Sequence, residues 1–236
     1  MLLIRKAVAE LIGTALLLVA VIGSGIAAQR LSPHDTGLQL LENAIATGAA
    51  LVAIILAVGS VSGAHLNPVI SLVDAALGGL RRGEIAVYIA AQVSGAVAGA
   101  VVANLMFSLS AVTFSSHERS SGGLWLGEVV ATFGLVLVVF GTVRSGRSSA
   151  APFAVGAYIT GAYFFTSSTS FANPAVTFAR MLSDTFAGIA PGSVAAFVAF
   201  QLVGGALGYT AARLLWPSMH DAAGRVVVPH AQREVS

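Results

Sequence analysis

Two asparagines that each precede a proline are the residues of this 236-residue chain best suited to act on a small molecule. Asn67 and Asn173 stand in the stretches His65-Leu-Asn-Pro-Val69 and Phe171-Ala-Asn-Pro-Ala175. Asparagine is a favoured N-cap and proline a favoured first helical residue, so each pair predicts the start of a helix. If the amide oxygen accepts the capping hydrogen bond, the NH₂ donors stay free to bind the oxygen of a solute.

The composition places these residues in a membrane. Apolar residues make up 56% of the chain and charged residues 9%, whereas soluble domains carry about 25% charged residues. The net charge of +2 gives no reason to expect a nucleic-acid partner, and the absence of cysteine excludes disulfides and thiolate metal sites. We therefore expect an all-α protein embedded in the lipid bilayer, a single domain over residues 1–236 with a polar tail at 219–236.

Six apolar segments have about the 20 residues that cross a bilayer as a helix. They lie at residues 7–28, 41–61, 85–107, 124–142, 151–166 and 193–216. The first of them is too long for a cleaved signal peptide and contains Glu10, so it is expected to be retained. Two shorter stretches begin at the prolines, 68–77 and 174–182, and at about 1.5 Å per residue each reaches half-way through the hydrocarbon. We expect these two to be re-entrant half-helices.

The basic residues predict the orientation. With a cytoplasmic N-terminus, nine of the twelve Lys and Arg residues lie inside, and only Arg30, Arg119 and Arg180 lie outside. Cytoplasmic loops carry the excess of Lys and Arg. The sequence therefore predicts a multi-pass membrane protein with both termini in the cytoplasm.

The halves of the chain, about 7–107 and 124–216, repeat each other. Glu10 aligns with Glu128, Gln92 with Gln201, and the first Asn-Pro pair with the second. Each half holds three spans and one half-helix, so the second copy is inverted in the membrane. Interrupted segments in an inverted repeat predict a site near the bilayer midplane.

This inversion would bring the two half-helix N-termini together. Each contributes about half a positive charge from its aligned peptide dipoles, which repels cations. The amides of Asn67 and Asn173 would hold the oxygen of a passing neutral molecule and orient water against proton transfer. The sequence thus predicts a passive channel with these two residues at the pore centre.

Glu10 and Glu128 are carboxylates within apolar helices, which is costly in a membrane. One interpretation is a proton relay. The other is that they accept N–H groups from the non-helical segments before the half-helices, which need partners. Their symmetric places favour this loop-supporting role.

Little else in the sequence carries chemistry. His65 has no histidine or carboxylate companion nearby in sequence, so a structural or pore-lining role is favoured over metal binding. The pairs Gly95 with Gly99 and Gly204 with Gly208 are typical of closely packed membrane helices. With no nucleophile–base pair, metal cluster or phosphate loop, we expect no enzyme activity, no metal and no cofactor.

The paired Asn-Pro motifs, together with AELIGT near the start, SGAHLNPV and FANPAV, resemble the aquaporin or major intrinsic protein family over residues 7–216. The resemblance implies six transmembrane helices and two half-helices in an inverted 3+3 repeat. It also implies a homotetramer in which each subunit has its own pore. The first triplet departs mildly from the family pattern, with Val69 in place of Ala.

The resemblance further implies a selectivity filter. In most relatives an arginine directly follows the second triplet, where this chain has Val176. The family's spacing gives the other filter positions as Thr47, twenty residues before Asn67, and Gly161 and Ser170, twelve and three residues before Asn173. These side chains are small and uncharged, and replacing Arg by Val removes five N–H donors. We expect a wide filter that admits larger solutes.

Bacterial members with this valine resemble the aquaglyceroporins of arsenic-resistance operons, the AqpS type. That similarity implies passage of arsenous acid and methylated arsenicals besides glycerol-like polyols and water. Two alternatives stay open: a general glycerol, urea or water facilitator, and a non-conducting or adhesive membrane protein of the same fold.

Arg180 lies four residues beyond Val176, on the same face of the second half-helix and one turn nearer the outside. It could form a positive outer mouth that partly replaces the missing filter arginine. The alternative is an ion pair with Asp184 at the negative end of the half-helix.

Overall fold

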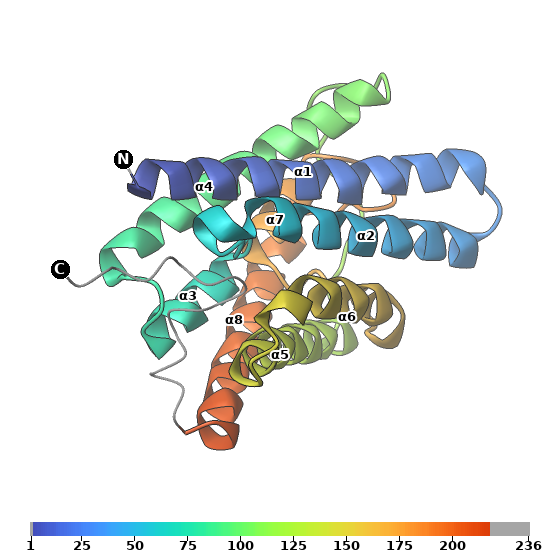
Figure 1. Cartoon of the computed structure of the whole chain (residues 1–236). Helices are drawn as coiled ribbons and strands as arrows, with labels where there is room; N and C mark the ends of the chain where they lie inside the picture. Colours follow the sequence, from blue (N-terminus) through green and yellow to red (C-terminus); the bar gives the residue numbers. More distant parts are fainter. Residues whose placement is uncertain (1, 218–236) are drawn as a thin grey trace.

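A computed structural model of the chain describes residues 2–217, which form a bundle of α-helices (Figure 1). The helices are α1 (Leu2–Leu31), α2 (Thr36–Ser62), α3 (Pro68–Leu77), α4 (Arg82–Met106), α5 (Gly122–Arg144), α6 (Ala151–Phe165), α7 (Pro174–Arg180) and α8 (Pro191–Leu215). A short 3₁₀ turn, Ser148–Ala150, precedes α6. The polar tail predicted at 219–236 lies outside the described residues.

The prediction of an all-α membrane fold is confirmed, with small differences in helix length. Five helices of the described chain, α1, α2, α4, α5 and α8, are long and apolar enough to cross a membrane. The remaining expected span forms α6, whose 15 residues reach about 22 Å. The second half-helix, α7, ends at Arg180, two residues earlier than predicted.

The two half-helices begin as their capping residues predict. Asn67 has an extended backbone, and its side chain accepts a hydrogen bond from Val69 N at 2.9 Å. Asn173 does the same for Ala175 N at 3.0 Å and Val176 N at 3.3 Å. Each following proline takes the first helical position, where no N–H is needed.

Helices of the two halves pack in equivalent pairs. α1 lies against α4 and α2, and α5 lies against α8 and α6, while α3 and α7 meet within the bundle (Figure 1). A Cβ on Gly95 would lie 2.2 Å from Leu11 O, and one on Gly204 would lie 2.5 Å from Val129 O. The predicted packing role of these glycines is therefore confirmed, because no larger residue fits between the paired helices.

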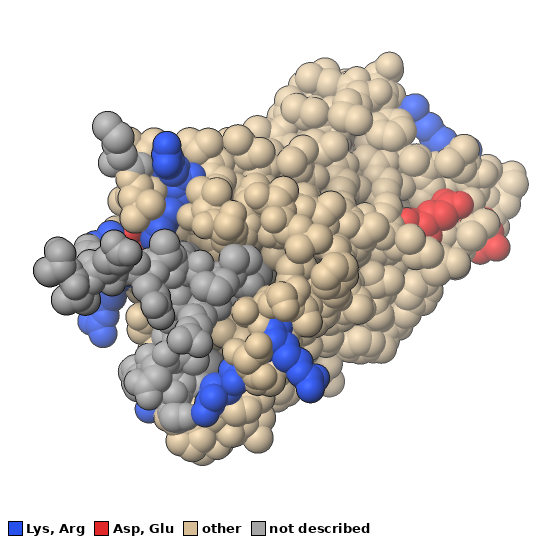
Figure 2. Space-filling model, viewed as in Figure 1, with Lys and Arg blue, Asp and Glu red and all other residues tan. Residues whose placement is uncertain are grey.

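Different residues gather at the two ends of the bundle. At the Lys6 end, Lys6 Nζ lies 3.9 Å from Glu84, which also pairs with Arg81 at 2.6 Å. At the opposite end, called here the Arg30 end, Arg30 donates to Phe107 O and Arg119 donates to Gly188 O, at 2.6 and 2.9 Å. In the view of Figure 2 most of the Lys and Arg surface lies near the end that carries the N-terminus, and most of the Asp and Glu surface lies at the other end.

Candidate functional site

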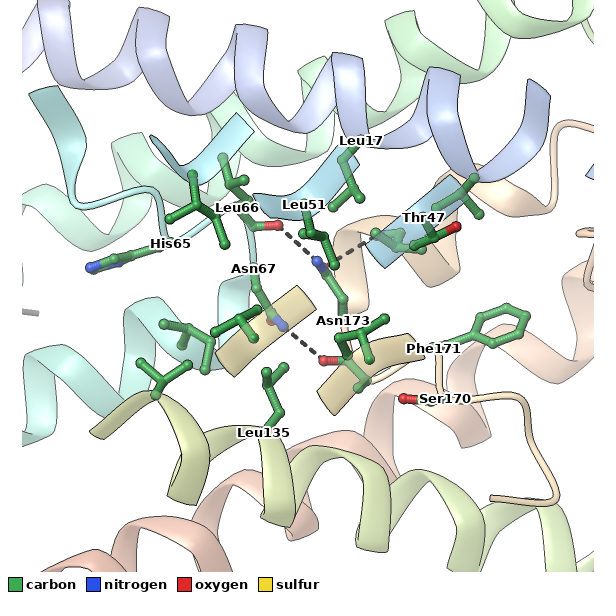
Figure 3. Close-up of a pocket in the computed structure, with 18 of the residues that line it drawn as sticks. Leu17, Thr47, Leu51, His65, Leu66, Asn67, Leu135, Ser170, Phe171 and Asn173 are labelled. Carbon is green, nitrogen blue, oxygen red and sulfur yellow. Dashed lines mark hydrogen bonds between the residues drawn. The ribbon is translucent and has the colours of Figure 1, made fainter. Parts of the chain in front are cut away.

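The N-termini of α3 and α7 meet in the middle of the bundle. Asn67 Nδ2 donates to Ala172 O and Asn173 Nδ2 donates to Leu66 O, at 2.7 Å in both cases (Figure 3). The sequence led us to expect that the amide donors would be free. One donor of each amide instead cross-links the two halves, which leaves one N–H per asparagine for a solute.

A narrow cavity of about 70 Å³ passes both asparagines. It extends from Ala64 and His65 in the segment after α2 to Thr47 and Arg180 toward the Arg30 end. Its middle part is walled by apolar side chains such as Leu17, Leu51 and Leu135 (Figure 3). A water molecule needs about 10–15 Å³ of such space, so the cavity has room for a short single file of small molecules.

The segment before α3 is held by Glu10. Ala64 and Leu66 have positive φ values of 48° and 50°, a conformation that costs on the order of 1–3 kcal/mol for residues other than glycine. Glu10 accepts hydrogen bonds from His65 N at 3.0 Å and Leu66 N at 2.7 Å, and also from the Gln92 side chain at 2.7 Å.

Glu128 has the equivalent role before α7. It accepts hydrogen bonds from Phe171 N and Ala172 N, at 2.9 Å in both cases, and from the Gln201 side chain at 2.5 Å. Both carboxylates are fully buried and neither lines the cavity. These contacts favour the loop-supporting role over the proton relay, because a relay group must reach the solute path.

Three of the filter residues predicted from the family spacing line the cavity: Thr47, Ser170 and Val176. The Thr47 hydroxyl lies 3.2 Å from the Tyr163 hydroxyl. Ser170 Oγ is buried and has no hydrogen-bond partner in the part of the chain that the structure describes. A hydroxyl without a protein partner on a cavity wall is available to a solute.

The structure does not bring Gly161 to the cavity. Gly161 is exposed, and the α6 residues that line the cavity are Val155, Ile159 and Tyr163. These three are spaced by four and so share a helix face, whereas a residue two positions away points about 200° around the helix. At this level of the cavity the wall is therefore formed by Tyr163 and not by the expected Gly161. The apolar spacing of α6 was the signal that could have found it.

Arg180 also lines the cavity, and it is only 2% exposed. Its Nε donates to Ala187 O, and its guanidinium carbon lies 3.4 Å from the centroid of the Phe171 ring. The alternative of an Asp184 pair is not found. Asp184 accepts hydrogen bonds from Ser116 N at 2.9 Å and Ser116 Oγ at 3.1 Å.

An equivalent contact exists near the first asparagine. His65 and Phe171 each stand two residues before an asparagine of the pair, and Asp74 and Arg180 each stand seven residues after it. His65 Nε2 lies 3.5 Å from Asp74 Oδ2, with both side chains 1% exposed. The same two repeat positions thus contact each other in both halves, but with a carboxylate in one half and a guanidinium in the other.

Among residues 2–217 no group of three or more His, Asp or Glu side chains is arranged to hold a metal ion. The polar side chains that line the cavity are amides, hydroxyls, one imidazole and one guanidinium, all of which can form hydrogen bonds.

Comparison with known proteins gives a consistent picture. The profile of the family described as "Major intrinsic protein" matches residues 1–170. The chain is 50% identical over 202 residues, 86% of each chain, to "Aquaglyceroporin AqpS" of Rhizobium meliloti (strain 1021). It is 31% identical over 230 residues to Aquaporin Z of Rhodopseudomonas palustris, covering 90% of this chain and 94% of that one. The X-ray structure of the aquaglyceroporin from Plasmodium falciparum superposes with a TM-score of 0.71, at 20% identity, over 93% of this chain and all of the other.

Proposed function

Because the chain belongs to the major intrinsic protein family, it is a passive membrane channel for water and small solutes, and we propose that its preferred solutes are small polyhydroxylated molecules. These are glycerol-like polyols, arsenous acid and methylated arsenicals, with water as a co-permeant. The high identity to a relative named an aquaglyceroporin supports the glycerol-like class. The arsenic substrates rest on the valine after the second triplet, Val176, and on the subgroup that it resembles.

The observation that carries this proposal is the meeting of Asn67 and Asn173 in a cavity with apolar walls. Each asparagine lines the cavity and offers one N–H that no protein group accepts among the described residues. A neutral solute with several hydroxyl groups can exchange its water for these donors while its carbon or arsenic faces the apolar wall. Cations lack that compensation at the apolar positions and are also repelled by the two helix N-termini.

The residues proposed to contact the solute are Asn67 and Asn173 at the centre, and Thr47, Tyr163, Ser170 and Val176 toward the Arg30 end. Glu10 and Glu128 are proposed to hold the two loops. We also propose that the Lys6 end is cytoplasmic, that the membrane is the bacterial plasma membrane, and that four subunits assemble with a pore in each. Basic residues at the Lys6 end support the orientation.

Proteoliposomes containing the purified chain test the proposal. Stopped-flow light scattering should show glycerol and arsenous acid influx well above that of empty liposomes, with water flux also raised. Arsenous acid flux at the level of empty liposomes, beside fast glycerol flux, would make the chain a general facilitator. A correctly folded chain that conducts none of the three would instead be a structural membrane protein.

A further inference from the structure

Arg180 is the one Lys, Arg, Asp or Glu residue among the described residues that line the central cavity. It comes from α7, one helical turn beyond Val176, and the side chain is almost completely buried. A buried charge is costly unless it is paired. The groups around Arg180 therefore decide what its charge does.

The carboxylates nearest to Arg180 in sequence and space have other partners. Asp184 is exposed and bound to Ser116, whose backbone N–H holds the pKa of that carboxyl below its usual range. Glu128 binds the backbone before α7. Within residues 2–217 no ion pair reaches Arg180.

The guanidinium is nevertheless fixed in place. Its Nε donates to Ala187 O, and the guanidinium group lies over the Phe171 ring. Arg119 lies on the same ring, 5.1 Å from its centroid, so two cations stand close together at this end of the cavity. In the described structure no protein group accepts from the two terminal nitrogens of Arg180, whose N–H groups remain for a ligand.

Hydroxyl groups complete the same stretch of the cavity wall. Ser170 Oγ has no hydrogen-bond partner among residues 2–217, and the Tyr163 and Thr47 hydroxyls bond each other. A guanidinium presents parallel N–H groups that match two oxygens on one central atom, and hydroxyls beside it can both donate and accept. This set of groups fits an oxyacid better than it fits a simple alcohol.

We propose that Arg180, with the hydroxyls of Ser170 and Tyr163, forms a binding site for small oxyacids and their monoanions at the Arg30 end of the cavity. The site deepens the proposed function and rests on it, since an oxyacid bound at Arg180 is taken up only if the channel conducts. The positive groups raise the local concentration of monoanions. Further along the cavity, the asparagine N–H groups and the two helix N-termini also stabilise negative charge.

The test compares methylarsonate, a monoanion at neutral pH, with glycerol in proteoliposomes. Arg180→Met should lower methylarsonate uptake by about tenfold, which corresponds to about 1.4 kcal/mol, while glycerol uptake changes less than about twofold. Arg180→Lys, which keeps the charge but loses the fork, should retain part of the uptake. The matched control is Arg30→Met, an exposed arginine at the same end that lies outside the cavity, and it should change neither flux.

Two results overturn the site. One is an equal loss of both fluxes in Arg180→Met, and the other is no loss of either. If the variant does not fold, competition in the unmodified channel decides, because methylarsonate bound at Arg180 must slow glycerol influx, and no slowing refutes the site. An unmodified channel that fails to conduct glycerol would refute the proposed function instead.

Discussion

Asn67 and Asn173 bind each other's loops reciprocally: each side-chain amide donates, at 2.7 Å, to the carbonyl of the residue that directly precedes the other asparagine. The same side chains cap their own helices through the amide oxygen. Each asparagine thus caps its own helix and also connects the two halves of the chain. One N–H of each amide has no acceptor among the described residues, and both asparagines line the cavity.

Replacing Asn173 by Asp keeps the capping oxygen and removes the donor to Leu66 O. We expect the unfolding free energy to fall by about 2 kcal/mol, because a buried hydrogen bond is lost and two oxygens face each other. The new negative charge should also weaken cation exclusion, measured as proton flux in proteoliposomes. Asn104→Asp is the matched control, since Asn104 donates to Ala111 O and Leu182 O away from the cavity. A proton flux that stays the same in both variants would contradict the role of the central pair.

Replacing Val176 by Arg introduces a second guanidinium into the cavity beside Arg180. Glycerol permeability should fall by about tenfold, equivalent to about 1.4 kcal/mol of barrier, and proton leakage should fall with it, because the cavity narrows and gains positive charge. Stopped-flow and pH-sensitive dye measurements check both. Val176→Leu adds volume without charge and should leave the proton leak as it is. If Val176→Arg leaves the leak unchanged, the half-helix N-termini alone exclude protons.

Substitutions at Tyr163 and Gly161 separate the residue that lines the cavity from the one first predicted. Tyr163→Leu should raise glycerol and urea permeability by several-fold, because it removes a ring from the wall and frees Thr47. Gly161→Ala should change neither, since its Cβ would meet only the Phe165 ring, at 3.7 Å. The reverse pattern of permeabilities would restore Gly161 as the filter position.

Glu10→Gln and Glu128→Gln test the support of the loops. An amide side chain can accept at one oxygen only, so each variant should lose about 2–4 kcal/mol of stability through unsatisfied buried N–H groups. Thermal unfolding in detergent should show similar losses for both, and water and glycerol flux should fall together. A variant of normal stability that alters proton flux alone would support the relay interpretation.

Gly95→Ala should destabilise the pairing of α1 and α4 by about 3 kcal/mol, because the new methyl group would overlap Leu11 O. Gly83→Ala is the control within the same helix. Beyond its own stretch of helix, no atom of the described chain lies within 4 Å of its added Cβ, so the change should be neutral or stabilise by up to about 1 kcal/mol. Equal effects of the two variants on the unfolding temperature would argue against close helix packing at Gly95.

The parts of the fold and site that follow from local chemistry could be predicted from the sequence. Capping by Asn67 and Asn173 is a property of Asn-Pro dipeptides, and the meeting of their helices follows from the repeat. The residue of α6 that faces the cavity could not be found by counting back from Asn173. The path of the irregular segment 166–173 between them depends on Glu128 and its contacts.

The partners of Arg180 were also beyond the sequence. Spacing placed Asp184 one turn away, but α7 ends at Arg180, and Asp184 turns toward Ser116 in the loop between α4 and α5. That choice is made by a tertiary contact between segments 68 residues apart.

In each half, the residue two positions before the asparagine contacts the residue seven positions after it. This pair of contacts makes the two entrances of the channel different. In the first half Asp74 contacts His65, and in the second half Arg180 contacts Phe171. An inverted repeat with identical halves would present the same charges to solutes from both compartments. Because one half has Asp74 where the other has Arg180, the two ends of the channel differ in electrostatic potential. A neutral solute is not affected by this difference. An anion that enters from the end with Arg180 is attracted by its positive charge, and an anion that enters from the other end meets no equivalent charge.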